Sequence, residues 1–479
     1  MKKKFELKGH WFLPERKSKV QVFGVLTSDG KRITLEAFGN FDGDIFTRGL
    51  KDETIIQGIL SDSKKMTLYG CYMTHSAGVT LIQGEESGVK PNTYLIQYVF
   101  EGALIDKPEQ LKFQKLVCTI HNLDEWVGIS GFFEKKRKSV EFFNREKGTI
   151  DIDYSLPNQI SFKINEHYDC LFNFTVNTPT ISRYQKGVEM EQEVQLVILS
   201  KKDTDFEDLI DVINKFQNFL TLALYSDTTF KEISLYSDSF TADNGSGGKY
   251  RKRIDLFFIS GNEAYEEKLK LDLEMLFTYN NIKDDFSEII KNWFKKYGEL
   301  EAAFNLLFEQ FYHKGHFNEN NFLNLAQAAE TLHAQLHKDK TRMPKNEYNE
   351  MKKAIREKTP KEYHSWLDQQ FAFGNHLTLD MRLTDLVNDY SNKILDKIIS
   401  DKELFVKQVK WSRNYYTHYS SSLKKNALKG SELFYLAEKL KLLLVCAFLI
   451  EVGFSKKLIE EKLDWVKWRL FNHLANWRE

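Results

Sequence analysis

The stretch VQVFGVLTSDGKRITLEAFG, residues 20–39, decides the fold of the first half of the chain. It holds two apolar runs on either side of the tetrapeptide SDGK at residues 28–31. Asp and Gly at these positions favour a tight reversal of the backbone, and the flanking Val, Ile and Leu favour strands. We therefore predict a β-hairpin with its turn at residues 28–31.

The hairpin pattern recurs along the N-terminal half. The segment IIQGILSDSKKMTLYGCYM, residues 55–73, has a second polar turn at residues 61–63. Strands at high density, separated by short polar turns, predict a sandwich or an irregular barrel. Further runs rich in Val, Ile, Tyr and Phe lie at residues 93–105, 111–123, 148–156, 159–177 and 194–200.

The pattern changes at Asp203. The segment DTDFEDLIDVINKFQNFLTLALY, residues 203–225, has apolar residues at helical spacing after an acidic first turn. The predicted fold is α+β, with a β-rich domain at residues 1–262 followed by an all-helical bundle at residues 263–479. In the bundle, helices are expected at residues 286–296, 299–310, 319–337, 345–356, 379–399, 401–419, 432–452 and 455–477.

Composition limits the class of protein. In 479 residues, 68 Lys and Arg balance 68 Asp and Glu, which excludes a globally basic nucleic-acid coat but allows a local basic groove. The four cysteines form no CxxC pair, so neither a zinc ribbon nor a disulfide scaffold is expected. The start of the chain lacks the apolar core of a signal peptide, and the most apolar run, residues 440–452, is too short for a membrane span. We expect a reduced, cytoplasmic protein with no membrane partner.

No motif predicts a metal or a cofactor. The sequence lacks HExxH, GxSxG, an EF-hand loop and the glycine patterns of nucleotide-binding loops. His333 and His337 lie four residues apart on an expected helix, a spacing that can bind a metal, but no nearby Cys or acidic pair completes the ligands. We interpret this pair as a polar helix edge with one histidine packed, and expect neither metal nor cofactor.

The segment KWSRNYYTHY, residues 410–419, concentrates polar and aromatic side chains. Arg413 precedes His418 by five residues, and Asn414 follows the arginine directly. On a helix Asn414 and His418 share a face, and the long side chain of Arg413 can bend into the same groove. A histidine can transfer protons near neutral pH, and an arginine can stabilise phosphate oxygens. The segment is therefore a candidate for metal-independent RNA cleavage through the ribose 2′-hydroxyl.

One copy of this segment supplies one histidine, although the reaction needs both a general base and a general acid. Two copies facing each other across a two-fold axis would supply both, so a homodimer is expected. The alternative is a surface arginine, a surface amide and a packed histidine with no catalytic role. The three tyrosines of the segment could stack on unpaired bases, or line a core or a dimer seam.

Residues 413–418, RNYYTH, resemble the Rx4–6H motif of HEPN domains, which are all-helical ribonuclease domains. Residues 321–337, NFLNLAQAAETLHAQLH, are similar to the first core helix of such domains, which often carries an acid near the active cleft. Glu330 matches that acid; the alternative is an exposed helix acid. Residues 431–461 resemble the helix pair that follows the motif.

The β-rich half resembles the N-terminal domain of ApeA, a family of bacterial anti-phage proteins that end in a HEPN domain. The resemblance rests on HWFLPERKSKVQVFGVLTSDGKRITLEAFGNF at residues 10–41 and on VCTIHNLDEWVG at residues 117–128. It implies a metal-independent endoribonuclease of abortive infection whose site residues are Arg413, His418, Asn414 and Glu330.

In that interpretation the β-rich domain senses infection or restrains the nuclease, and RNA is the substrate, with tRNA as one candidate. The phage trigger stays unidentified. The competing hypothesis is a catalytically inactive RNA-binding or dimerisation module whose β-rich domain binds a phage protein or a small ligand. The two hypotheses differ in whether His418→Ala abolishes RNA cleavage and protection.

Overall fold

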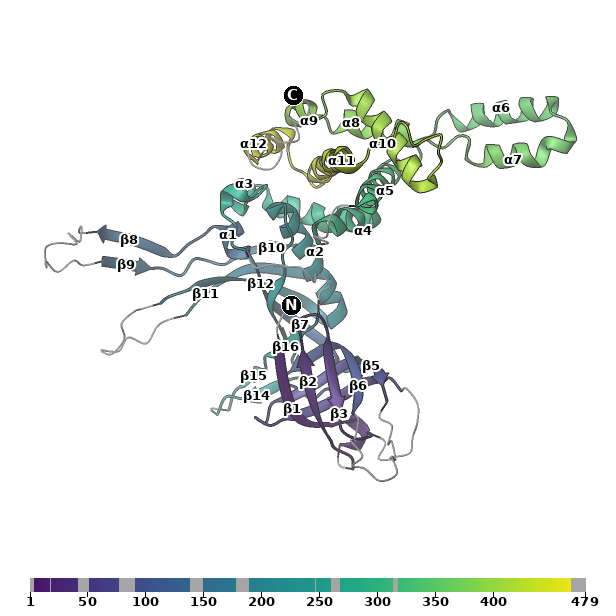
Figure 1. The fold of residues 1–479 in the computed structure, drawn as a ribbon. Helices are drawn as coiled ribbons and strands as arrows, with labels where there is room; N and C mark the ends of the chain where they lie inside the picture. Colours follow the sequence, from purple (N-terminus) through teal and green to yellow (C-terminus); the bar gives the residue numbers. More distant parts are fainter. Residues whose placement is uncertain are drawn as a thin grey trace. The chain divides into compact units, whose positions relative to one another are not determined.

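The computed structural model divides the chain into two compact units, Met1–Ser287 and Glu288–Glu479 (Figure 1). The first unit is mainly β and the second is helical, which confirms the predicted fold class. The domain boundary predicted between residues 262 and 263 lies outside the described residues. The structure describes residues 4–17, 19–41, 51–76, 91–137, 150–177, 189–245, 247–259, 268–312 and 318–466.

Six strands of the first unit close into an antiparallel barrel. Around the barrel the order is β1-β2-β3-β6-β5-β4, and β4 pairs again with β1, with Leu60 opposite Gly9. Of the two predicted arrangements, these strands therefore adopt the barrel. They are β1 (Phe5–Phe12), β2 (Val22–Ser28), β3 (Ile33–Ala37), β4 (Glu53–Leu60), β5 (Lys65–His75) and β6 (Asn92–Glu101).

The predicted hairpin is the connection between β2 and β3. The carboxylate of Asp29 accepts hydrogen bonds from the backbone N–H groups of Lys31, at 2.7 Å, and Arg32, at 2.8 Å. Gly30 has a φ of 86°, a conformation that costs glycine nothing because it has no Cβ. Residues close together in the sequence are thus sufficient to form this turn.

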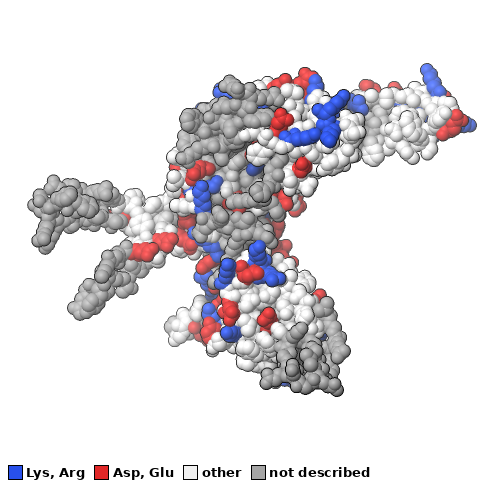
Figure 2. Space-filling view, in the orientation of Figure 1, with Lys and Arg blue, Asp and Glu red and all other residues white. Residues whose placement is uncertain are grey.

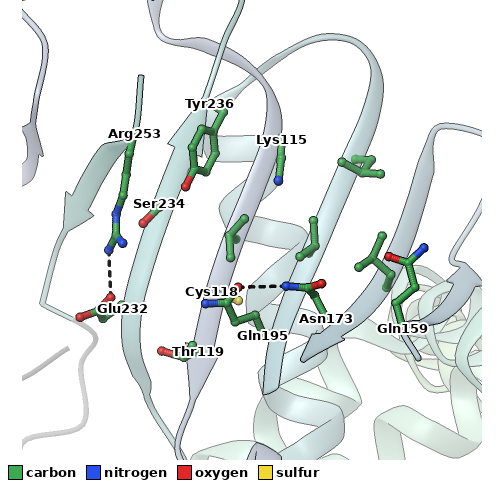
Figure 3. A pocket seen from close by; sticks show the side chains of 14 residues that line it. Lys115, Cys118, Thr119, Gln159, Asn173, Gln195, Glu232, Ser234, Tyr236 and Arg253 are labelled. Atoms are coloured by element: carbon green, nitrogen blue, oxygen red, sulfur yellow. Dashed lines mark hydrogen bonds and ion pairs between the residues drawn. The ribbon is translucent and has the colours of Figure 1, made fainter. Parts of the chain in front are cut away.

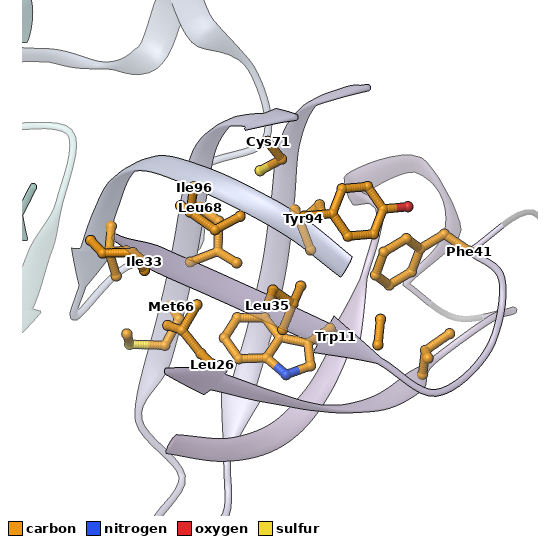
Figure 4. Packing of buried hydrophobic residues seen from close by; sticks show 14 of the residues in the cluster. Trp11, Leu26, Ile33, Leu35, Phe41, Met66, Leu68, Cys71, Tyr94 and Ile96 are labelled. Atoms are coloured by element: carbon orange, nitrogen blue, oxygen red, sulfur yellow. The ribbon is translucent and has the colours of Figure 1, made fainter. Parts of the chain in front are cut away.

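The barrel interior is filled by apolar side chains around Trp11 (Figure 4). Trp11 is fully buried, and its Nε1–H donates a hydrogen bond to the carbonyl oxygen of Gly24 at 3.1 Å. A Cβ added to Gly58 would lie 2.4 Å from the Trp11 ring, so this position requires glycine. The neighbours of the ring in this core include Leu26, Ile33, Leu35, Met66, Leu68 and Ile96.

A second sheet continues from the barrel strand β6, in the order β6-β16-β13-β7-β12-β11-β10. Helix α2 (Phe206–Leu224) packs on this sheet against β12 and β7. Next to α2, Trp126 of α1 (Leu123–Val127) packs edge-to-face against Phe172 of β11 and Phe219 of α2. The two helices therefore bury one face of this sheet in a hydrophobic core. The strands are β7 (Lys112–Ile120), β10 (Ile160–Lys163), β11 (Tyr168–Val176), β12 (Gln192–Asp205), β13 (Phe230–Tyr236) and β16 (Ile254–Phe257).

The remaining elements of the first unit are short. Strand β8 (Phe132–Arg137) pairs with β9 (Ile150–Tyr154), and β14 (Thr241–Asp243) pairs with β15 (Lys249–Arg251). Helix α3 (Tyr279–Ile282) is a single turn. Four 3₁₀ turns lie in the described chain, at Pro14–Arg16, Pro108–Gln110, Asp272–Glu274 and, in the helical unit, Lys361–Tyr363.

The helical unit is built around α11 (Gly430–Glu451), whose side chains are buried on several sides. The ring of Phe448 on α11 stacks on Phe304 of α4 (Phe286–Tyr312), with centroids 4.0 Å apart. The other helices are α5 (Glu319–Leu336), α6 (Lys345–Lys358), α7 (His364–Phe373), α8 (Leu379–Asp389), α9 (Lys393–Ile398), α10 (Lys402–His418) and α12 (Lys456–Val466).

Two details of the helix prediction are wrong. Residues 379–399 form two helices, because the side chain of Asn392 caps α9 by accepting hydrogen bonds from backbone N–H groups. Helix α7 was not expected, since Leu367 is its one buried side chain and its apolar periodicity is weak. The end of the helix predicted at residues 455–477 lies outside the described residues. In the described part of the chain, the helices are either too short or too polar to cross a membrane.

Candidate functional site

Helix α10 carries the RNYYTH segment in its last two turns. Its first turn is capped by Asp401, whose carboxylate accepts a hydrogen bond from the N–H of Leu404 at 2.8 Å. Buried side chains recur along the helix at helical spacing, namely Phe405, Val406, Val409, Ser412 and Tyr416. This stripe faces the bundle, and the partly or fully exposed side carries Arg413, Asn414 and His418.

Arg413 is held by an acid from another helix. Its Nη2 lies 3.2 Å from Oε2 of Glu330 on α5, and each side chain is 30% exposed. Asn414 adds a longer contact, in which its Oδ1 accepts from Nη1 of Arg413 at 3.4 Å. The fold thus brings three of the four predicted site residues together. Because a guanidinium has five N–H groups, Arg413 keeps donors for a phosphate.

His418 ends the same helix and stands apart from this cluster. Its side chain is exposed, and within the described residues it has no hydrogen bond or ion pair. The next residue, Tyr419, has a φ of 50°, and its backbone N–H donates to the carbonyl oxygen of Tyr415 at 2.6 Å. This left-handed residue ends the helix and leaves the imidazole accessible to an RNA strand or a second subunit.

Two buried polar side chains of α10 anchor the connection to α11. Oγ of Ser412 accepts a hydrogen bond from the backbone N–H of Leu428 at 3.1 Å. The hydroxyl of Tyr416 donates to the carbonyl oxygen of Leu428 at 2.9 Å. The loop at residues 419–429 is therefore fixed beside the motif. Of the three tyrosines in the segment, Tyr416 belongs to the packed side of the helix.

A second polar network joins α5 to α8. His333 is fully buried, with Nε2 at 2.7 Å from Oδ2 of Asp385 and Nδ1 at 3.2 Å from Nη1 of Arg382. Arginine can only donate, so Nδ1 accepts and Nε2–H donates to the carboxylate, which assigns the neutral tautomer. Burial lowers the pKa of His333, although the hydrogen bond that His333 donates to Asp385 opposes the shift. This neutral ring lies one turn from Glu330 on α5 and locks α5 to α8.

Both ring nitrogens of His333 are thus engaged by protein groups. His337 lies 3.8 Å from a carboxylate oxygen of Asp389. Among the residues that the structure describes, no group of three or more His, Cys, Asp or Glu side chains could hold a metal ion. The roles of Arg382 and Asp385 are not predictable from the sequence, because their contacts with His333 join residues about fifty positions apart and leave no local pattern.

The first unit has a separate hollow of about 270 Å³ on its second sheet (Figure 3). Nζ of Lys115 lies 5.1 Å from the ring centroid of Tyr236, and Arg253 pairs with Glu232 at 2.9 Å. The hydroxyl of Thr119 is buried there without a hydrogen-bond partner among the described residues. The lining mixes charged, amide and aliphatic groups, and no motif in the sequence indicated this hollow.

Family models match both parts of the chain. The model described as ApeA N-terminal domain 1 matches residues 6–293, more than half of the 479 residues. The chain belongs to the ApeA family. A second model, described as Apea-like HEPN, matches residues 323–458, which include all four predicted site residues. No curated protein and no solved structure matched the chain in the comparisons.

The resemblance inferred from the sequence is therefore confirmed. The two families connect this ApeA-family chain with anti-phage defence and with a HEPN domain, a domain class that is typically a ribonuclease. HEPN domains generally act on RNA and dimerise. These statements describe the families. Any reaction of this chain has to be inferred from its own side chains.

Proposed function

We propose that this ApeA-family chain is a metal-independent endoribonuclease of anti-phage defence that acts as a homodimer in the cytoplasm. One observation carries the proposal. Within the residues that match the HEPN model, α5 and α10 bring Glu330, Arg413 and Asn414 together, and the exposed His418 lies about one turn further along α10. An arginine oriented by an acid, with an accessible imidazole about one turn further along the same helix, suits phosphodiester cleavage in RNA.

In the proposed reaction, the ribose 2′-oxygen attacks the adjacent phosphorus while one His418 takes the 2′-hydroxyl proton. Arg413 donates hydrogen bonds to the phosphate oxygens as negative charge develops on them. The bond from phosphorus to the 5′-oxygen breaks, and His418 of the partner subunit donates a proton to that leaving oxygen. The products are a 2′,3′-cyclic phosphate and a 5′-hydroxyl, and no water or metal ion is consumed.

Glu330 and Asn414 have positioning roles in this proposal. Glu330 orients the guanidinium of Arg413, and Asn414 contacts the same group from the neighbouring position on α10. The N-terminal unit would sense infection or restrain the nuclease, and the cleavage of cellular RNA, with tRNA as one candidate, would cause abortive infection.

The test compares the full-length wild type with Arg413→Ala and His418→Ala on labelled cellular RNA in EDTA. Loss of an arginine that stabilises developing charge costs about 10²- to 10³-fold in rate, and loss of a general base or acid about 10²- to 10⁴-fold. Both variants should keep the circular dichroism and melting temperature of the wild type. The wild-type ends should carry 2′,3′-cyclic phosphate.

Two outcomes would overturn the proposal. Cleavage that requires a metal and leaves 3′-hydroxyl ends would refute the mechanism. RNA binding without cleavage, together with phage protection by His418→Ala, would instead support the inactive RNA-binding module.

A further inference from the structure

The region around the motif has an uneven distribution of charge. Between Glu403 and Glu432, 28 residues contain six Lys and Arg and neither Asp nor Glu. Some of these cations have acidic partners from elsewhere: Lys410 pairs with Asp380 at 3.1 Å, and Arg413 pairs with Glu330. Figure 2 shows Lys and Arg side chains gathered where Figure 1 places α10.

Three further lysines lie in the loop that follows the motif. Lys424, Lys425 and Lys429 are exposed, and within the described residues none of them forms an ion pair with a carboxylate. Nζ of Lys429 lies 5.9 Å from the ring centroid of Tyr415. Ser412 and Tyr416 fix the backbone of the loop at Leu428, directly before Lys429.

An aromatic ring stands at the same place. Tyr419 is 66% exposed, and its ring centroid lies 5.6 Å from that of Tyr415. Its φ of 50° is a region that bulky residues rarely adopt and in which glycine is the usual residue at a helix end. The cost of this conformation argues for a role of the side chain beyond packing.

We propose that Tyr419 and the three lysines form a binding surface for single-stranded RNA next to His418, which we call the Tyr419 platform. The ring of Tyr419 stacks on an unpaired base, and Lys424, Lys425 and Lys429 contact the phosphates on either side of that base. This assignment rests on the proposed function, because it names the RNA form that the same site accepts.

Charge and chemistry favour RNA as the occupant of this surface. Lys424, Lys425 and Lys429 form no ion pair with a carboxylate within the described residues, and such cations match a phosphate backbone. An exposed aromatic ring can stack on a base only where that base has left its duplex, so single-stranded segments and loops are preferred over helices. The platform would therefore direct cleavage to unpaired regions of a folded RNA.

The test is performed in the full-length His418→Ala background, so that binding is measured without cleavage. The probes are a fluorescent single-stranded RNA and a duplex of the same sequence. Tyr419→Asn, which tolerates the left-handed backbone, should keep the melting temperature and weaken binding of the single strand about tenfold. Tyr419→Trp should retain wild-type affinity, and the duplex should bind equally to all three proteins.

The lysines are tested by salt dependence. Replacing Lys424, Lys425 and Lys429 by Gln should reduce the slope of log K against log salt by about two, since each phosphate contact on a single strand contributes about 0.7. The control replaces the exposed Lys353 and Lys358 of α6 by Gln, and its slope should match that of the parent protein. An equal loss in the control would show that the binding is unspecific and would overturn the platform.

Other results separate this proposal from the proposed nuclease. If the wild type does not cleave RNA but Tyr419→Asn still weakens single-strand binding, the nuclease fails and the platform stands. If the wild type cleaves and Tyr419→Asn binds and cleaves equally well, the platform fails alone. Loss of the dimer on gel filtration of Tyr419→Asn, with RNA affinity unchanged, would assign the ring to a subunit interface and would also overturn the platform.

Discussion

The contact between Glu330 and Arg413 allows the role of the acid to be measured. In Glu330→Gln an oxygen remains that can accept the 3.2 Å hydrogen bond from Arg413, but the charge is lost. A charged hydrogen bond contributes about 1 kcal/mol more than a neutral one. If that bond orients the guanidinium in the transition state, kcat/KM should fall about fivefold.

Glu330→Ala removes the bond altogether. Because both side chains are mostly but not fully buried, we expect a loss of about 2 kcal/mol, or roughly thirtyfold in kcat/KM. The assay is the rate of cleavage of a labelled RNA at substrate concentrations well below KM. Glu330 would then act by positioning, with a graded response from Gln to Ala.

The matched control is Asp380→Asn. Asp380 pairs with Lys410, one turn before Arg413 on α10, at 3.1 Å and with comparable exposure. Its neutralisation should change kcat/KM less than twofold, because Lys410 has no role in the proposed reaction. Two results would refute the reasoning. Activity of Glu330→Gln as low as that of His418→Ala would make Glu330 a proton-transfer group, and wild-type activity of Glu330→Ala would leave the contact without a function.

Four further substitutions test the fold, two of them through the pH dependence of its stability. Burial raises the pKa of Asp124 from 3.8 to about 6. The contribution of this carboxyl group to the free energy of unfolding is therefore lost as the pH rises through 6. Between about pH 5 and pH 8, the free energy of unfolding of Asp124→Asn, measured with urea, should rise by about 1 kcal/mol relative to that of the wild type. The lowered pKa of His333 acts in the opposite direction. The contribution of the neutral imidazole to the free energy of unfolding is lost as the pH falls below the ordinary pKa of histidine. The stability of the helical unit in His333→Gln should therefore fall less than that of the wild type between about pH 7 and pH 5. Unchanged pH profiles would contradict both expectations. Gly58→Ala places a Cβ 2.4 Å from the Trp11 ring and should lower the free energy of unfolding by about 1–3 kcal/mol, whereas Gly298→Ala, with open space around it on α4, should raise it by about 0.5–1 kcal/mol.

Local patterns in the sequence predict several parts of this protein. The β2–β3 turn depends on Asp29 and Gly30, which act on backbone atoms within three residues. The RNYYTH segment lies on one helix because its neighbours have helical spacing, so the helix itself places Arg413, Asn414 and His418 within its last two turns. Interactions of this range are encoded by adjacent residues, so they can be predicted without knowledge of the fold.

Other features depend on residues far apart in the chain. Closure of the barrel requires β1 to pair with β4 and β5 to pair with β6, and the alternation of apolar residues is equally compatible with a sandwich. The division between α8 and α9 depends on the cap at Asn392, which competes with an otherwise continuous helical pattern. Such choices are decided by packing over the whole unit.

The candidate site likewise combines features that the sequence determines with features that depend on the tertiary structure. The sequence by itself determined which residue types could stabilise a phosphate and move a proton, and that three of them share a helix. Only the tertiary structure decided that Glu330 reaches Arg413 across 83 positions, that Tyr416 is packed and that Tyr419 is exposed. The physical reason is that side-chain chemistry belongs to each residue, whereas burial and contacts between distant residues arise only when α5, α10 and α11 pack together.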